Sequence, residues 1–187
     1  MKLSNSITIM LASLMLTLPA HHAIASELDA HEHGSANLDI AIDTDTIQMS
    51  FESPAVNIVG FEYTTDDKQQ LLLIKQATDF LSNVDALFSL VGDVSCQIVK
   101  SSANWVTEHE EGHKEHEDHD ETPLSEHAEF IAEYELTCNQ LNNLAAIKVN
   151  LFEFFPAIAD LDVQVIYSGG QIKQELNSNN TLIELTH

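Results

Sequence analysis

The stretch AEFIAEYELTC, residues 128–138, decides the fold of this chain. Glu129, Glu133 and Glu135 alternate in it with small and apolar side chains. The apolar side consists of Ala128, Phe130, Ala132, Tyr134, Leu136 and Cys138. Alternation with a period of two is typical of a strand that buries one face. We therefore predict a long core strand over these residues.

The sequence before this strand predicts its partner. Apolar and polar residues alternate over 94–98, which indicates a strand that runs toward Trp105. Between the two strands lies TEHEEGHKEHEDHDETPLSEH, residues 107–127. Because this segment has no apolar residue before Pro123, it cannot bury itself. We interpret it as the long tip of a hairpin that joins two core strands.

Two further patterns lie upstream. Alternating runs at 37–43 and 47–52 flank a turn and predict a hairpin. The apolar segment 52–62, ESPAVNIVGFE, predicts a short irregular connection that packs against the core. From Asp66 to Leu90 the apolar residues recur three or four apart, which predicts a helical segment with a core-facing side, with a break possible at 83–85.

The downstream half completes the fold class. Alternating or short apolar runs predict strands at 145–151, 161–167, 171–176 and 182–185, with a hairpin turn at Gly169–Gly170. Many short strands with one substantial helical segment favour an α+β fold. We predict a mostly antiparallel sheet with helices packed on one face, and a long hairpin loop rich in histidine and acid.

The N-terminus has the features of an export signal. Lys2 is followed by an apolar run, Ile7–Leu18, that is too short to span a bilayer. Ala23–Ala25 is a small-x-small cleavage site, so we predict a signal peptide over residues 1–25 and a single domain over 26–187. Ser26 is not a cysteine, which argues against a lipid anchor. We expect a soluble protein in a bacterial periplasm, with no membrane anchor.

The two cysteines of the chain are Cys96 and Cys138. An oxidising compartment favours a disulfide between them, and both lie in the core-facing register of their predicted strands. The alternative is that both are soft zinc ligands.

Charge narrows the range of partners. The chain has 30 acidic residues against 7 lysines and no arginine, with a formal net charge of −23. A field of this sign repels nucleic acid and anionic membranes, and it raises the local concentration of cations. We therefore expect no nucleic-acid partner.

Histidines in the acidic segment predict metal binding. Its members are His109, His113, His116, His119 and His127. Neutral imidazole suits zinc, copper and nickel, and the surrounding carboxylates add oxygen ligands. The alternative is a solvated acidic loop whose histidines have no role. A second pair, His31 and His33, lies two residues apart and points one way in an extended segment, although a frayed N-terminus with incidental histidines is also possible.

Catalytic motifs are not found. His31-Glu32-His33 lacks the spacing of the HExxH zinc motif, and no serine nucleophile elbow occurs. We therefore predict that the protein is not an enzyme.

Several segments together resemble the ZrgA-like family of periplasmic, zinc-regulated proteins. They are His31–Gly34, Glu52–Ala55, Asn57, Val59–Glu62, Ser125–Phe130, Tyr134–Cys138, Phe155–Pro156 and Val163–Val165. The resemblance implies zinc binding in the periplasm and a part in zinc acquisition alongside an ABC-type transporter. It also implies that His31, His33 and the histidines of the loop are the metal-binding positions.

Two hypotheses follow from these patterns. In the first, the protein captures or buffers zinc, with an ordered site at His31 and His33 that His127 or a nearby carboxylate closes, and looser sites on the loop. In the second, it is an adaptor or regulator that docks on a membrane permease through residues 52–62, with metal as effector. A core position for Val56, Ile58 and Phe61 would favour the first.

Overall fold

Two paired strands flank the acidic segment, as the sequence predicts. The computed structural model describes residues 33–108 and 127–185. In it β4 (Ser95–Glu108) and β5 (His127–Asn139) are antiparallel, with register from Ser95 opposite Asn139 to Glu108 opposite His127. Residues 109–126 lie outside the described part, so the shape of the loop itself stays a prediction.

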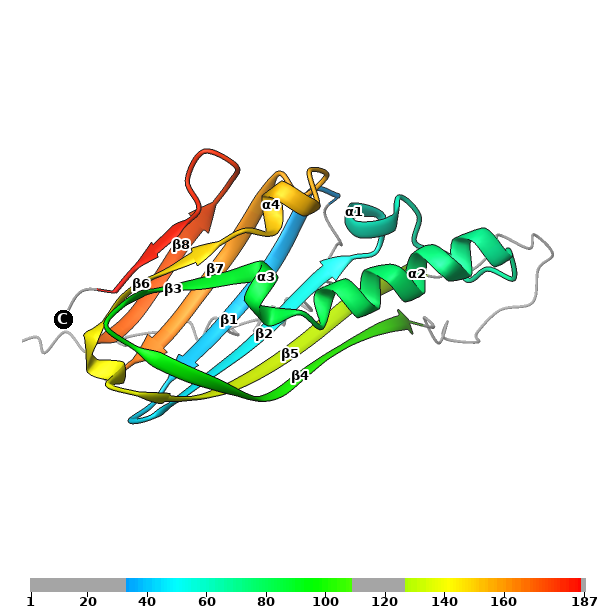
Figure 1. Cartoon of the computed structure of the whole chain (residues 1–187). Helices are drawn as coiled ribbons and strands as arrows, with labels where there is room; N and C mark the ends of the chain where they lie inside the picture. The colour runs from blue at the N-terminus through cyan, green and yellow to red at the C-terminus, as the bar shows by residue number, and fades with distance from the viewer. Residues whose placement is uncertain (1–32, 109–126, 186–187) are drawn as a thin grey trace, which may run out of the picture. The chain divides into compact units, whose positions relative to one another are not determined.

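β4 and β5 belong to a six-stranded sheet (Figure 1), whose order is β4-β5-β2-β1-β7-β8. The other strands are β1 (Ser35–Ile42), β2 (Thr46–Pro54), β7 (Asp160–Tyr167) and β8 (Gly170–Leu176). Neighbouring strands are antiparallel except β1 and β7, which are parallel, so the sheet is mixed.

A second layer covers one face of this sheet (Figure 1). It contains a three-stranded sheet and short helices. The strands, in sheet order, are β3 (Phe88–Gly92), β6 (Leu144–Val149) and β9 (Leu182–Glu184). The helices are α1 (Val56–Val59), α2 (Lys68–Leu81), α3 (Val84–Leu87), a 3-10 turn η1 (Leu141–Asn143) and α4 (Leu151–Phe154).

The core lies between the two layers. Leu38, Phe51 and Tyr134 point inward from neighbouring strands and are almost fully buried. The ring of Phe88 on β3 meets that of Tyr134 edge-on, with centroids 5.5 Å apart. The fold is thus mostly sheet, as predicted. The prediction of one sheet covered by helices is incomplete, because a second sheet shares that face with them.

The predicted helical segment differs most from the structure. Asp67 caps the N-terminus of α2 by accepting hydrogen bonds from the backbone N–H of Gln69 and Gln70. The helical region ends earlier than Leu90, because Phe88–Gly92 pairs with β6 as a strand. Leu72 is 54% exposed, so the apolar side of α2 is only partly core. Burial is confined to Ala77 and Leu81, near the end of α2.

Cys96 and Cys138 form the predicted disulfide. They are directly opposite in the β4–β5 pair, which brings their side chains together on one face. The alternative role as zinc ligands is wrong in this structure, since both sulfur atoms are bonded to each other.

The predicted signal peptide lies outside the described residues. Within the described residues, no helix is both long and apolar enough to cross a membrane.

The buried phenol of Tyr134 gives a test of the core. Its O–H donates to the carbonyl of Leu81 at 2.7 Å, and burial raises the pKa of Tyr134 above its ordinary value. Tyr134→Phe leaves that carbonyl without its donor, so we expect the free energy of unfolding to fall by about 1–2 kcal/mol at neutral pH. Denaturant titration measures this loss. Tyr63→Phe, at a side chain that is 51% exposed, is the control and should change stability little.

We also expect the stability difference between wild type and Tyr134→Phe to depend on pH. A folded-state pKa above the unfolded value means that the unfolded chain ionises first, so the stability tied to the neutral phenol declines as pH rises above about 10. The difference between wild type and Tyr134→Phe should therefore shrink in that range. If the stability difference between the two proteins stayed constant to high pH, Tyr134 would not be a buried hydrogen-bond donor.

Candidate metal centre

Strand pairing brings three chain segments to one end of the large sheet. β2 lies between β1 and β5 and is antiparallel to both, with Asn37 opposite Glu52 and Pro54 opposite Glu129. The C-terminal end of β2 therefore lies beside the N-terminal ends of β1 and β5. Residues just before β1, just after β2 and at the start of β5 meet there.

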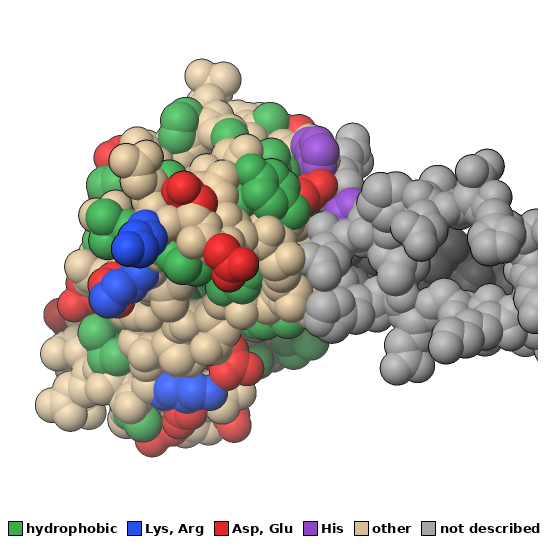
Figure 2. Space-filling model, turned by 90° about the vertical axis from the view of Figure 1, so that its right-hand side faces the viewer, with side chains coloured by type: hydrophobic (Ala, Val, Ile, Leu, Met, Phe, Trp, Pro, Cys, Tyr) green, Lys and Arg blue, Asp and Glu red, His purple; other side chains and the backbone are tan. Residues whose placement is uncertain are grey.

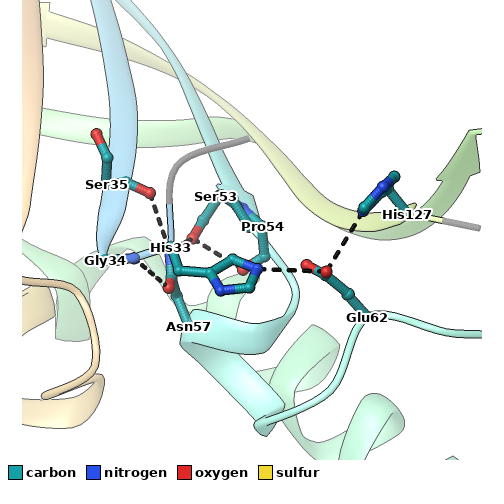
Figure 3. A network of polar contacts seen from close by, with 8 residues as sticks. All are labelled: His33, Gly34, Ser35, Ser53, Pro54, Asn57, Glu62 and His127. Carbon is teal, nitrogen blue, oxygen red and sulfur yellow. Dashed lines mark hydrogen bonds and ion pairs between the residues drawn. The ribbon is translucent and has the colours of Figure 1, made fainter. Parts of the chain in front are cut away.

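His33, Glu62 and His127 come from these segments (Figure 3). Glu62 lies between the two imidazoles, with its Oε1 atom 3.3 Å from His33 Nε2 and 3.3 Å from His127 Nδ1. The side chain of Glu62 is 21% exposed, against 34% for His127 and 64% for His33. Figure 2 shows histidine and acidic side chains together at the surface. The cluster is therefore reachable from solvent, with the carboxylate at its base.

The spacing fits zinc. Zinc binds histidine nitrogen and carboxylate oxygen at about 2.0–2.2 Å, most often with tetrahedral geometry. Two ligands of such an ion lie about 3.3 Å apart, which follows from those bond lengths and the tetrahedral angle. Both N···O distances to Glu62 have this value. The same distances are also those of an ordinary hydrogen bond or ion pair between imidazole and carboxylate, so they are compatible with zinc without requiring it.

The second oxygen of Glu62 supports the same interpretation. Its Oε2 atom is buried and accepts no hydrogen bond from the residues that the structure describes. A buried carboxylate oxygen without a partner is costly, and a bound cation removes that cost. Among residues 33–108 and 127–185, no group of three or more His, Cys, Asp or Glu side chains is arranged so that it could hold a metal ion by itself. A metal site at His33, Glu62 and His127 would therefore need a further ligand or a rearrangement of these side chains.

A glycine turn places Glu62 in this position. After β2 ends at Pro54, the chain forms the single turn α1. This turn ends at Gly60, which has φ +86. The N–H of Gly60 donates to the carbonyl of Val56, which closes the helix. The chain then reverses, Phe61 is buried against Trp105 with ring centroids 5.8 Å apart, and Glu62 faces the histidines.

The predicted connection over 52–62 is therefore a short helix and turn that pack on the core. Phe61 is 9% exposed, and Val56 and Ile58 are half-buried. Ala55 is fully buried. The covering of these residues favours the role of a structural support over that of an exposed docking loop.

The structure brings together two of the predicted metal ligands, His33 and His127. The other predicted ligands lie outside the described residues: His31, His109, His113, His116 and His119. The sequence analysis expected a nearby carboxylate without naming it, and the carboxylate that the structure places beside both histidines is that of Glu62. The signal for it was the VGFE segment at 59–62, whose acid ends an otherwise apolar run.

Comparison with known proteins decides the family. The family described as ZrgA family zinc uptake protein matches residues 30–185. This chain belongs to the ZrgA family. The match spans His33, Glu62 and His127, and membership indicates a role in zinc uptake. A search among curated proteins finds no significant match.

The turn that carries Glu62 provides a test of this ZrgA family member. A Cβ at position 60 would meet no atom within 4 Å, so Gly60→Ala introduces backbone strain alone. We expect it to lower the free energy of unfolding by about 1–2 kcal/mol, measured by denaturant titration. Gly60→Asn should lose less, since asparagine tolerates a positive φ better. Equal stability of wild type and Gly60→Ala would contradict the left-handed turn.

Proposed function

We propose that this ZrgA family protein binds zinc in the periplasm and captures or buffers the ion for acquisition, in cooperation with an ABC-type transporter. One observation carries the proposal: a single carboxylate oxygen, Glu62 Oε1, lies 3.3 Å from a nitrogen of each of two histidines, while Oε2 is buried. Family membership supports zinc as the ion. The ligand chemistry alone also suits copper and nickel.

The proposed ordered site uses His33 Nε2, His127 Nδ1 and the Glu62 carboxylate. His31, two residues from His33, is the proposed source of a fourth ligand. The loop histidines 109, 113, 116 and 119 form a second, looser class that exchanges ions among the acids. A tight site next to weaker ones suits a protein that collects ions from dilute solution and releases them again.

Binding without catalysis is part of the proposal. Two histidines and a glutamate with an open position are also the ligand set of some zinc hydrolases. Hydrolysis needs, in addition, a general base beside the open position, as in the HExxH motif, which this sequence lacks. The alternative role, a non-catalytic adaptor on a permease with metal as effector, loses support from the partial burial of residues 52–62.

Ligand variants test the ordered site. His33→Ala, His127→Ala and Glu62→Gln should each weaken the tightest zinc site at least tenfold, on the order of 1.4 kcal/mol, because each removes one bond to the ion. Competition with a chelator of known zinc affinity measures the change. Glu133→Gln is the matched control, since Glu133 pairs with Lys100 on the outer face of the sheet. If all three variants kept wild-type affinity, the site would lie elsewhere.

Shortening the loop separates the two proposed classes of site. Deleting residues 109–121 should lower the number of zinc ions bound per chain, measured by titration and elemental analysis of dialysed protein. The tight site and the stability of the metal-free protein should remain, since the β4–β5 register ends at Glu108 and His127. Loss of the tight site would show that loop residues, rather than Glu62, dominate binding.

A further inference from the structure

Asn57 is a buried polar residue beside the proposed metal site. It is 4% exposed on α1, in a structure whose buried side chains are almost all apolar. A buried amide is stable only when its donors and acceptor find partners. The partners of Asn57 therefore indicate what it does.

The Asn57 amide joins α1 to the segment that carries His33 (Figure 3). Its Oδ1 accepts a hydrogen bond from the N–H of Gly34 at 2.8 Å. Its Nδ2 donates to the carbonyl of Ser35 at 2.8 Å and to Ser53 Oγ at 3.2 Å. Both donor hydrogens and the acceptor are thus in use.

These contacts hold the backbone at His33 in place. The N–H that Asn57 receives belongs to the peptide bond between His33 and Gly34, so the orientation of that peptide is set by the amide. The carbonyl of Gly34 is held from the other side by the N–H of Ala159 at 2.7 Å and of Asp160 at 3.0 Å. The imidazole of His33 is 64% exposed and gains little support from packing. Its reach toward Glu62 therefore depends on this held backbone.

Asn57 also lies on the element that delivers Glu62. Glu62 lies five positions after Asn57, and the single turn of α1 with the cap at Gly60 connects them. One amide thus ties the backbone of one proposed ligand to the helix that leads to another.

We propose that Asn57 is a positioning residue of the metal site, whose side-chain amide holds His33 at ligand distance from Glu62 before the ion arrives. This inference rests on the proposed zinc site. Preorganised ligands lose less entropy on binding, and groups that orient metal ligands typically change affinity by about 10–100-fold when removed. A purely structural amide would alter stability and leave zinc affinity unchanged.

The test measures zinc affinity of Asn57→Ala by chelator competition, well below the melting temperature of each variant. We expect a loss of about tenfold or more. The control is Asn150→Ala, because Asn150 Nδ2 donates to the same kinds of group, the carbonyl of Ala86 at 3.3 Å and Ser89 Oγ at 3.2 Å, and serves the small sheet instead. Asn150→Ala should lower stability and keep zinc affinity.

A double-mutant cycle identifies the route of the effect. If Asn57 acts through His33, Asn57→Ala should weaken zinc binding in the His127→Ala background and add nothing in the His33→Ala background. If Asn57→Ala does not fold, Ser53→Ala replaces it in the cycle, since it removes one partner of the amide, and we expect a smaller loss with the same dependence on His33.

Two results separate failure of the inference from failure of the site. Wild-type zinc affinity in a folded Asn57 or Ser53 variant, with His33→Ala still weakened, would overturn the positioning role alone. Wild-type affinity in His33→Ala alone would remove His33 from the site and overturn the inference, whereas wild-type affinity in all three ligand variants would overturn the proposed site as well.

Discussion

The antiparallel placement of β2 between β1 and β5 is the constraint on which the candidate site depends. Because strand directions alternate across β5, β2 and β1, the end of β2 lies beside the starts of both neighbours. Backbone hydrogen bonds hold this register along the whole length of the strands, and a slip by one residue would turn every core side chain outward. The same pairing that buries Leu38, Phe51 and Tyr134 therefore brings His33, Glu62 and His127 to one end of the sheet.

The carboxylate of Glu62 is partly buried, and the groups around it offset only part of the cost of that burial. Glu62 is mostly removed from water and one of its oxygens has no partner among the described residues, which is unfavourable in the metal-free protein. The two imidazoles reduce that penalty by approaching the other oxygen. A zinc ion at the same place would interact with the carboxylate and with both nitrogens at once. Its binding would then remove the free-energy cost of burying the carboxylate oxygen. The net negative charge of the chain favours the approach of cations to the protein.

Support for the site comes from polar contacts that periodicity does not reveal. Asn57 uses its whole amide to connect α1 with the segment before β1, and Gly60 supplies the turn that directs Glu62 toward the histidines. Both residues lie in the segment 52–62, which carries no catalytic or metal motif of its own. Its contribution is geometric, since it determines how far Glu62 lies from the two histidines.

Most of the strands and the disulfide could be predicted from the residue pattern alone, and the family match supports the predicted link with zinc. Alternation with a period of two indicates a strand with one buried face. Residues 94–138 therefore predicted the β4–β5 pair and the inward direction of Cys96 and Cys138. It did not reveal the second sheet or the early end of the helical segment, because Phe88–Gly92 becomes a strand only by pairing with β6, some 55 residues later. Nor did it single out Glu62 among 30 acids. The place of Glu62 depends on long-range contacts, because hydrogen bonding between distant strands and a glycine turn set the two 3.3 Å distances between Glu62 and the histidines.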